Sequence, residues 1–255
     1  MVWWILPLGL FVGAVMGSLG GGGAIITIPL LVYLLGQSPH AATEGSLVIV
    51  GISSLIGLLP HARAGRVRWR DGAIFGALGI VGSIVGSTAS STIDGRLLLG
   101  LFSILLLVVA SLMLRRWRRG RGGGATVYPA RSFGAVLLTA TGVGLLTGFF
   151  GVGGGFAVVP ALTLVLGVPI TQAIATSLLV ISINCVTALA SRVTIGLHLD
   201  LQVVLPFAVA ASVGSVLGGW LTRDARPRTL QLAFACLLLV LAVWIGSQSL
   251  LALQV

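Results

Sequence analysis

The sequence has very little charge, which excludes the surface of an ordinary water-soluble domain. Only 8% of its 255 residues are charged, whereas a soluble domain carries charge at roughly a quarter of its positions. Hydrophobic residues make up 57% of the chain and form runs long enough to cross about 30 Å of hydrocarbon. We therefore expect an all-α polytopic membrane protein, because open strands cannot satisfy their backbone groups in lipid.

Lysine is absent and acidic residues are scarce. The fifteen basic residues are all arginines and face only five acids, for a net charge of +10. The arginines lie in short segments between apolar runs, where they act as topology determinants, and no basic groove with interleaved aromatic residues is visible. We therefore expect no nucleic-acid partner. The N-terminal residues lack a basic region and a small-residue cleavage site, so we expect no cleaved signal peptide.

Motifs for metals, cofactors and catalysis are also missing. Cys185 and Cys236 lie inside apolar runs, where we expect packed, inert thiols. His40, His61 and His198 are too scattered for metal-ligand spacing, and we expect them to pack at segment ends near the membrane interface. No Gly-Lys-Ser/Thr sequence follows a glycine cluster, as a nucleotide-phosphate loop requires. The sequence predicts no enzyme activity, no metal and no cofactor.

Glycine is abundant, with 37 residues, and it gathers in two clusters that lie 131 residues apart. A shift of 131 superposes Gly13, Gly17, Gly20, Pro29 and Ser46 on Gly144, Gly148, Gly151, Pro160 and Ser177. A shift of 132 then aligns Gly82 and Gly214. The match predicts a duplicated chain in which residues 1–114 form the first transmembrane repeat, 115–131 a basic linker, and 132–255 the second repeat.

Ten apolar runs, five in each half, are interpreted as helices. They are 3–19, 24–35, 41–59, 72–91, 97–114, 132–150, 156–167, 171–190, 201–221 and 229–253. The first two runs of a half are about 25 Å and 18 Å long as helices, which together is too long for one crossing and too short for two. We therefore predict a broken first element of two half-helices that meet inside the membrane, followed by three transmembrane helices. This gives eight spans, or ten segments counting half-helices.

The arginines also indicate how the segments are oriented, since cytoplasmic loops collect basic residues. If each half-helix pair returns to its starting side, thirteen of the fifteen arginines lie on one face, in loops 63–70, 115–131 and 223–228. A pair that crosses once gives a less uneven distribution. Equivalent loops of the two halves carry opposite bias, because four arginines in 63–70 correspond to one in 192–200. The pattern favours inverted repeats, with a cytoplasmic linker and both termini on the other side.

The glycine clusters and the segments that follow them resemble a known family. The segments concerned are 17–31 (GSLGGGGAIITIPLL) and 148–162 (GFFGVGGGFAVVPAL), together with 42–47 (ATEGSL) and 173–178 (AIATSL). They are similar to those of the sulfite exporter TauE/SafE family, also called the toluene sulfonate uptake permeases. The resemblance implies a secondary transporter of small sulfur-containing anions, such as sulfite or organosulfonates, in a bacterial inner membrane. One departure is that Glu44-Gly45 stands where the second half has Ala175-Thr176.

The glycine breaks are our candidate substrate site. Glycine lets a ligand approach without a Cβ in the way, and a half-helix that starts near Ala24 or Phe156 presents free N–H groups and the positive end of its dipole. The candidate binding residues at the breaks are Gly20, Gly22, Gly23, Gly151, Gly153, Gly154 and Gly155. The alternative is that these glycines only permit close helix packing.

Neutral side chains on the next helix of each half are further candidates, because hydroxyl and amide groups supply donors to sulfo oxygens. They are Thr43, Ser46 and Ser53 in the first half and Thr176, Ser177 and Asn184 in the second. The alternative for each hydroxyl is a bond to a carbonyl of its own helix. The amide of Asn184 is costly to bury without a partner, which favours a functional role.

Two charged residues need separate interpretations. Glu44 is expected in the first turn of a helix from Ala41, where its carboxylate would meet the helix dipole; the alternative is a proton-coupling group, and transport by Glu44→Gln across a pH series separates the two. Arg192 at a helix end is interpreted as a dipole partner or topology signal, with substrate steering as the alternative.

The leading hypothesis is transport by alternating access, with substrate bound near the glycine breaks of a multi-pass inner-membrane protein. The expected partners are a small anion and the lipid bilayer, and the sequence leaves the oligomeric state open, including a homo-oligomer. The alternatives are transport of another solute, such as a metal cation, and a non-transport accessory protein whose glycines are packing motifs.

Overall fold

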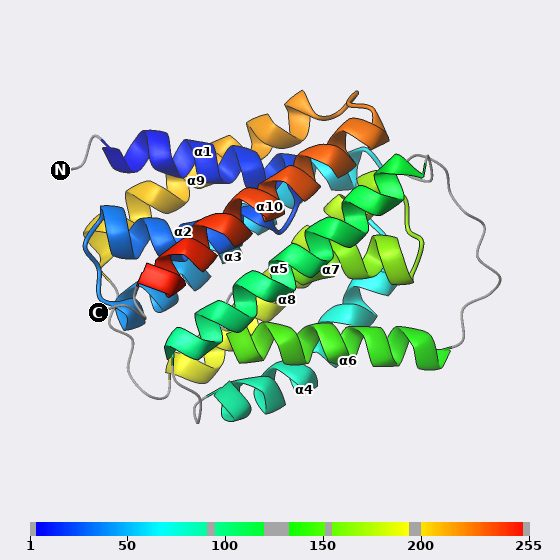
Figure 1. Cartoon of the computed structure of the whole chain (residues 1–255). Helices are drawn as coiled ribbons and strands as arrows, with labels where there is room; N and C mark the ends of the chain where they lie inside the picture. The colour runs from blue at the N-terminus through cyan, green and yellow to red at the C-terminus, as the bar shows by residue number, and fades with distance from the viewer. Residues whose placement is uncertain (1–3, 91–94, 120–132, 151–154, 194–199, 252–255) are drawn as a thin grey trace.

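A computed structural model describes residues 4–90, 95–119, 133–150, 155–193 and 200–251, and this part of the chain consists of helices and turns without a strand (Figure 1). The first half contains α1 (Ile5–Leu19), α2 (Gly22–Pro29), α3 (Pro39–Arg63), α4 (Trp69–Ser90) and α5 (Gly95–Arg118). The second contains α6 (Phe133–Phe150), α7 (Gly155–Pro160), α8 (Ile170–Val193), α9 (Leu201–Leu221) and α10 (Pro227–Leu251). The all-α prediction is confirmed.

Five helices of the described chain are long and apolar enough to cross a membrane, namely α3, α5, α8, α9 and α10. Helix α9 shows how such a helix meets the bilayer, because every fourth residue along it is a large apolar side chain that is exposed: Leu201, Leu205, Val209, Val213, Leu217 and Leu221. This spacing forms one continuous stripe along the helix. Water would penalise such a stripe, whereas hydrocarbon does not, so the chain is a multi-pass membrane protein.

A break separates α1 from α2, as the glycine cluster predicts. Gly20 has φ +75° and ψ −127°, a conformation that suits a residue without Cβ. The chain reverses here, and α2 runs back beside α1 (Figure 1). In the second half, α6 ends at Phe150 and α7 begins at Gly155, and the glycine turn predicted at 151–154 lies outside the described residues.

Both short helices widen into π-helical turns, which the sequence analysis did not predict. The turns η2 (Leu30–Leu34) and η3 (Ala161–Val165) directly follow Pro29 and Pro160. In a π-helical turn the backbone bonds run five residues back instead of four. The N–H of Leu35 accordingly donates to the Leu30 carbonyl five residues back, at 3.2 Å.

The two halves pack against each other by the same contact made twice. Helix α1 packs along α9, and α6 packs along α4. A Cβ on Gly13 would overlap the main chain of Ala211, and a Cβ on Gly144 would overlap the main chain of Gly79. The shifts of 131 and 132 residues relate these two pairs. Missing side chains therefore let the backbones touch, which is how helices associate when lipid removes the hydrophobic drive.

The directions in which successive helices run place the loops at two ends of the bundle. In Figure 1 each helix runs opposite to the one before it, so α6 begins at the end where α5 finishes and not where α1 begins. The ends of α3, α5 and α9 and the starts of α4 and α10 lie together, at what we call the arginine-rich end because segments 63–70, 115–119 and 223–228 are there. The Arg66 guanidinium donates to the Arg223 carbonyl at 2.6 Å and joins two of these segments.

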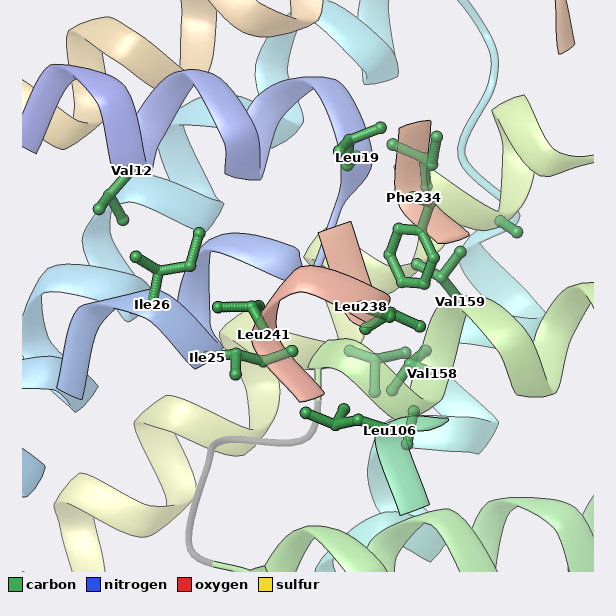
Figure 2. Packing of buried hydrophobic residues seen from close by; sticks show 14 of the residues in the cluster. Val12, Leu19, Ile25, Ile26, Leu106, Val158, Val159, Phe234, Leu238 and Leu241 are labelled. Atoms are coloured by element: carbon green, nitrogen blue, oxygen red, sulfur yellow. The ribbon is translucent and has the colours of Figure 1, made fainter. Parts of the chain in front are cut away.

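The hydrophobic core surrounds the two short helices. Figure 2 shows Ile25 and Ile26 of α2 and Val158 and Val159 of α7 close to residues of α5 and α10: Leu106, Phe234, Leu238 and Leu241. All of these side chains are buried. Helices α5 and α10, which pack on each other, therefore cover α2 and α7 with apolar side chains.

We predict that Gly13→Ala destabilises the protein by about 1–3 kcal/mol, because the new methyl group forces α1 away from α9. Thermal unfolding in detergent, followed by the loss of the monodisperse peak in size-exclusion chromatography, measures the effect. Gly142→Ala is the matched control, since no described atom lies within 4 Å of a Cβ built there. Alanine favours helix over glycine by up to about 1 kcal/mol, so the control is neutral or more stable. Equal destabilisation of both variants contradicts the packing interpretation.

Candidate functional site

The first residues of α2 and α7 meet at the centre of the fold. A Cβ on Gly21, the N-cap of α2, would overlap the main chain of Gly155, the first residue of α7. A Cβ on Gly155 would in turn lie 2.5 Å from the Gly21 Cα and 2.7 Å from a methyl group of Ile181. The first turns of a helix carry unsatisfied N–H groups and its positive dipole end. Two such ends, one from each half, are therefore in contact.

Gly20, next to this contact in the sequence, lies against α7 and α8 of the second half. A Cβ on Gly20 would lie 2.5 Å from Ser177 Oγ and 3.1 Å from a methyl group of Val159. The predicted candidates Gly20 and Ser177 thus lie together, from opposite halves. Gly23 has a different environment, because its Cβ would lie 2.7 Å from Met16 Cβ, so its lack of a side chain lets α2 pack on α1. The packing role that the sequence left open is present at this glycine.

Three of the candidate hydroxyls donate to their own helices. Ser46 donates to the Thr43 carbonyl at 2.8 Å, Ser53 to Ile49 at 2.6 Å and Ser177 to Ile174 at 2.8 Å. A hydroxyl that donates its proton in this way offers only lone pairs to other groups. In this arrangement these side chains do not supply donors to an anion, which leaves the backbone N–H groups as the better candidates.

The remaining candidates lie apart from one another. The Thr176 hydroxyl, fully buried, accepts from the N–H of Arg68 at 3.1 Å and ties α8 to the loop before α4. Asn184 Oδ1 is buried without a hydrogen-bond partner in the described chain, and a Cβ on Gly79 of α4 would lie 3.7 Å from it. Thr43 is half-buried and Gly22 opens α2, whereas Gly151, Gly153 and Gly154 lie outside the described residues.

The expected position of Glu44 was wrong. Helix α3 begins at Pro39 with Ser38 as its N-cap, whose Oγ accepts from the Ala41 N–H at 3.3 Å, and no acidic residue lies in the first turn. Serine followed by proline is a strong start signal, which the apolar run from Ala41 concealed. Glu44 lies in the second turn, where the dipole acts weakly on a carboxylate. The dipole interpretation of this residue therefore loses its basis.

Sequence reasoning missed several residues that join the two halves. Gly21 was not a candidate, because the 131-residue shift pairs it with Val152 and so conceals its importance. The Ser54 and Ser182 hydroxyls hydrogen-bond across α3 and α8 at 2.8 Å, joining the two halves. Arg116 of α5 donates to the Thr163 carbonyl in η3 at 2.5 Å. Their positions in apolar or basic segments gave no signal of these partners.

Comparison with known proteins decides the family. A model described as "Sulfite exporter TauE/SafE" matches residues 5–245. The chain belongs to the TauE/SafE sulfite exporter family. The match spans the helices of both halves, so the glycine contact at Gly21 and Gly155 lies in the part of the chain that the TauE/SafE model covers.

Proteins with similar sequences are described as transporters. A "Probable membrane transporter protein" of Xylella fastidiosa (strain 9a5c) is 36% identical over 92% of this chain and 90% of its own length. The "Probable membrane transporter protein YunE" of Bacillus subtilis is 27% identical over 93% and 94%. A Methanocaldococcus jannaschii relative with the same description is 26% identical over 94% and 95%. No solved structure matches the chain. We conclude that it is a membrane transporter of the TauE/SafE family.

We predict that Gly20→Ala lowers the stability of the protein more than Gly36→Ala does. Both glycines have positive φ, +75° and +66°, so both variants are strained, but only at Gly20 does a Cβ meet other atoms, with Ser177 Oγ 2.5 Å away. The added cost is about 1–3 kcal/mol, measured by thermal unfolding in detergent. The double variant Gly20→Ala, Ser177→Ala lacks the Ser177 Oγ, the atom nearest to the new methyl group. We therefore expect it to recover part of the lost stability. Equal effects at Gly20 and Gly36 contradict the contact.

Proposed function

We propose that this protein is a secondary transporter of small sulfur-containing anions, such as sulfite or organosulfonates, which bind where α2 and α7 begin. The observation that carries this proposal is the contact of Gly21 with Gly155, which brings two helix N-termini together. Each N-terminus carries the equivalent of about half a positive charge. Like ends repel each other, and an anion beside them relieves that repulsion.

The composition around the contact supports an anion held without a formal cation. No arginine occurs in α1, α2, α6 or α7. Helix dipoles and N–H groups hold an anion more weakly than a buried guanidinium does, because they carry partial charge and form no ion pair. Weak binding suits a transporter, which has to release its substrate. The family description, with its mention of sulfite, favours an oxyanion of sulfur over other anions.

We propose inverted repeats and alternating access as the mechanism. Support comes from the running directions in Figure 1, where α1 and α6 start at opposite ends, and from the repeated Gly13–Ala211 and Gly144–Gly79 contacts. Each half then has one half-helix pair, which returns to its starting side, and three helices that cross the membrane. The eight membrane segments counted from the sequence therefore comprise two pairs and six crossing helices. Rocking of one repeat on the other would expose a central site to each side in turn.

Charge distribution leads us to place the arginine-rich end in the cytoplasm. Cytoplasmic loops of membrane proteins collect basic residues, and the linker 115–131 alone has six arginines. In this orientation both termini face the other side of a bacterial inner membrane. The candidate binding residues are then the glycines of the breaks, with Ser177 beside Gly20. The side chains of Thr43, Ser46, Ser53 and Thr176 would have to change partners to contact substrate, and Asn184 would have to be reached at its place beside Gly79. Glu44 is retained as a proton-coupling candidate, tested by Glu44→Gln across a pH series.

Two other functions compete with this proposal. The close contact at Gly21 and Gly155 is also what an accessory protein with packing glycines would show. A metal cation as cargo is disfavoured, because the described residues contain no group of three or more His, Cys, Asp or Glu side chains suited to hold one.

We predict that the purified protein in proteoliposomes transports at least one of sulfite, thiosulfate, taurine and sulfoacetate above the level of protein-free vesicles. An accessory protein shows no such flux. A thermal-shift screen with the same four anions identifies the one that binds.

For that anion we expect Gly21→Ala to lower uptake roughly tenfold or more, since a displaced helix start loses oriented donors worth about 1.4 kcal/mol or more. Gly142→Ala is the matched control, with no described atom within 4 Å of its Cβ, and retains uptake. Normal uptake by a folded Gly21→Ala variant would place the substrate elsewhere.

A further inference from the structure

His61 lies inside the helix bundle, where three helices converge. It is in the last turn of α3 and is only 4% exposed, so it packs at a segment end as the sequence predicts, with its side chain inside the bundle. Its Nε2 lies 3.0 Å from the carbonyl oxygen of Gly17 on α1. A Cβ on Gly219 of α9 would lie 3.2 Å from the same nitrogen. The same nitrogen of the imidazole therefore lies beside both α1 and α9.

The carbonyl that His61 reaches is one that α1 leaves without a regular partner. The last four carbonyls of a helix lack intrahelical N–H donors, and α1 ends at Leu19, which places Gly17 among them. A carbonyl oxygen only accepts, so His61 Nε2 carries the hydrogen and donates it. This bond compensates for a buried acceptor that the break in the helix would otherwise leave unsatisfied.

The neighbouring glycines make room for this bond. A Cβ on Gly17 would overlap the main chain of Ser215 on α9, so α1 is held close to α9 at this residue. One turn further along α9, Gly219 leaves space for the ring of His61, and its Cβ would also lie 3.6 Å from the Gly17 oxygen. The side chain of His61 on α3 thus reaches the Gly17 carbonyl at the closely packed contact of α1 with α9.

We propose that His61 is a positioning residue that holds the end of α1 and, through it, the glycine break. Gly17 precedes Gly20 by three residues, and Gly21 contacts the start of α7. Movement of the Gly17 carbonyl therefore moves the helix start that the proposed function assigns to the substrate. The 131-residue shift pairs Gly17 and His61 with Gly148 and Arg192. Arginine is also a donor, so both halves have a donor side chain at this point of the sequence.

Hydrogen–deuterium exchange tests the proposal without any substrate. The amides of residues 17–24 are compared in purified wild type, His61→Leu and His61→Gln. We expect roughly tenfold faster exchange in His61→Leu, because a buried carbonyl loses its donor. His61→Gln stays near wild type, since its amide N–H can reach the same carbonyl.

Gln231→Leu is the matched control. Gln231 is 3% exposed and its amide nitrogen donates to the Met113 carbonyl at 3.2 Å, between α10 and α5. Its loss should leave exchange in residues 17–24 unchanged. Unchanged exchange in His61→Leu overturns the proposal, and so does equal acceleration in His61→Gln or Gln231→Leu, which would indicate a general loss of stability.

Sulfite uptake in proteoliposomes separates this inference from the function on which its last step rests. If wild type takes up sulfite, His61→Leu is expected to raise the half-saturating concentration and His61→Gln to restore it. If wild type takes up none of the four sulfur anions, the proposed function fails, while the exchange comparison still decides whether His61 positions the break.

Discussion

Direct contact between helix backbones is the constraint on which the rest of this structure depends. In lipid, apolar side chains gain little by leaving their surroundings, so association comes from close packing. Glycines provide it at Gly13 against Ala211 and at Gly144 against Gly79. Each contact joins a helix of one half to a helix of the other. Neither half could keep its present partners if side chains separated these backbones.

The same constraint forms the candidate site. Because α1 lies on α9 and α6 lies on α4, the short helices α2 and α7 are brought together with their first residues in contact. Apolar side chains of α5 and α10 cover them (Figure 2). A low-dielectric cover strengthens the field of the helix ends. An oxyanion site can therefore arise here from main-chain groups alone, with the arginines left at the end of the bundle.

Prediction from sequence succeeded where a local feature has one structural meaning. It failed where a second local signal was overlooked and where partners are distant in the sequence. The break after Leu19 followed from four consecutive glycines, and the helices followed from apolar runs. The start of α3 was misplaced because Ser38 and Pro39 precede the apolar run, so Glu44 was assigned to the wrong turn. The π-helical turns after Pro29 and Pro160 were not predicted, because no local pattern of residues marks a backbone bond that runs five residues back. The partner of His61 is 44 residues away in the sequence.

Composition and spacing along the chain are enough to identify a helical membrane protein with two similar halves and glycine breaks. Which groups meet at the centre depends instead on how the helices pack. The tertiary structure placed Gly21 rather than its neighbours against Gly155, turned the Ser46, Ser53 and Ser177 hydroxyls toward their own helices, and brought His61 to the end of α1. These contacts depend on how closely the helix backbones approach one another, and no local pattern of residues specifies that distance.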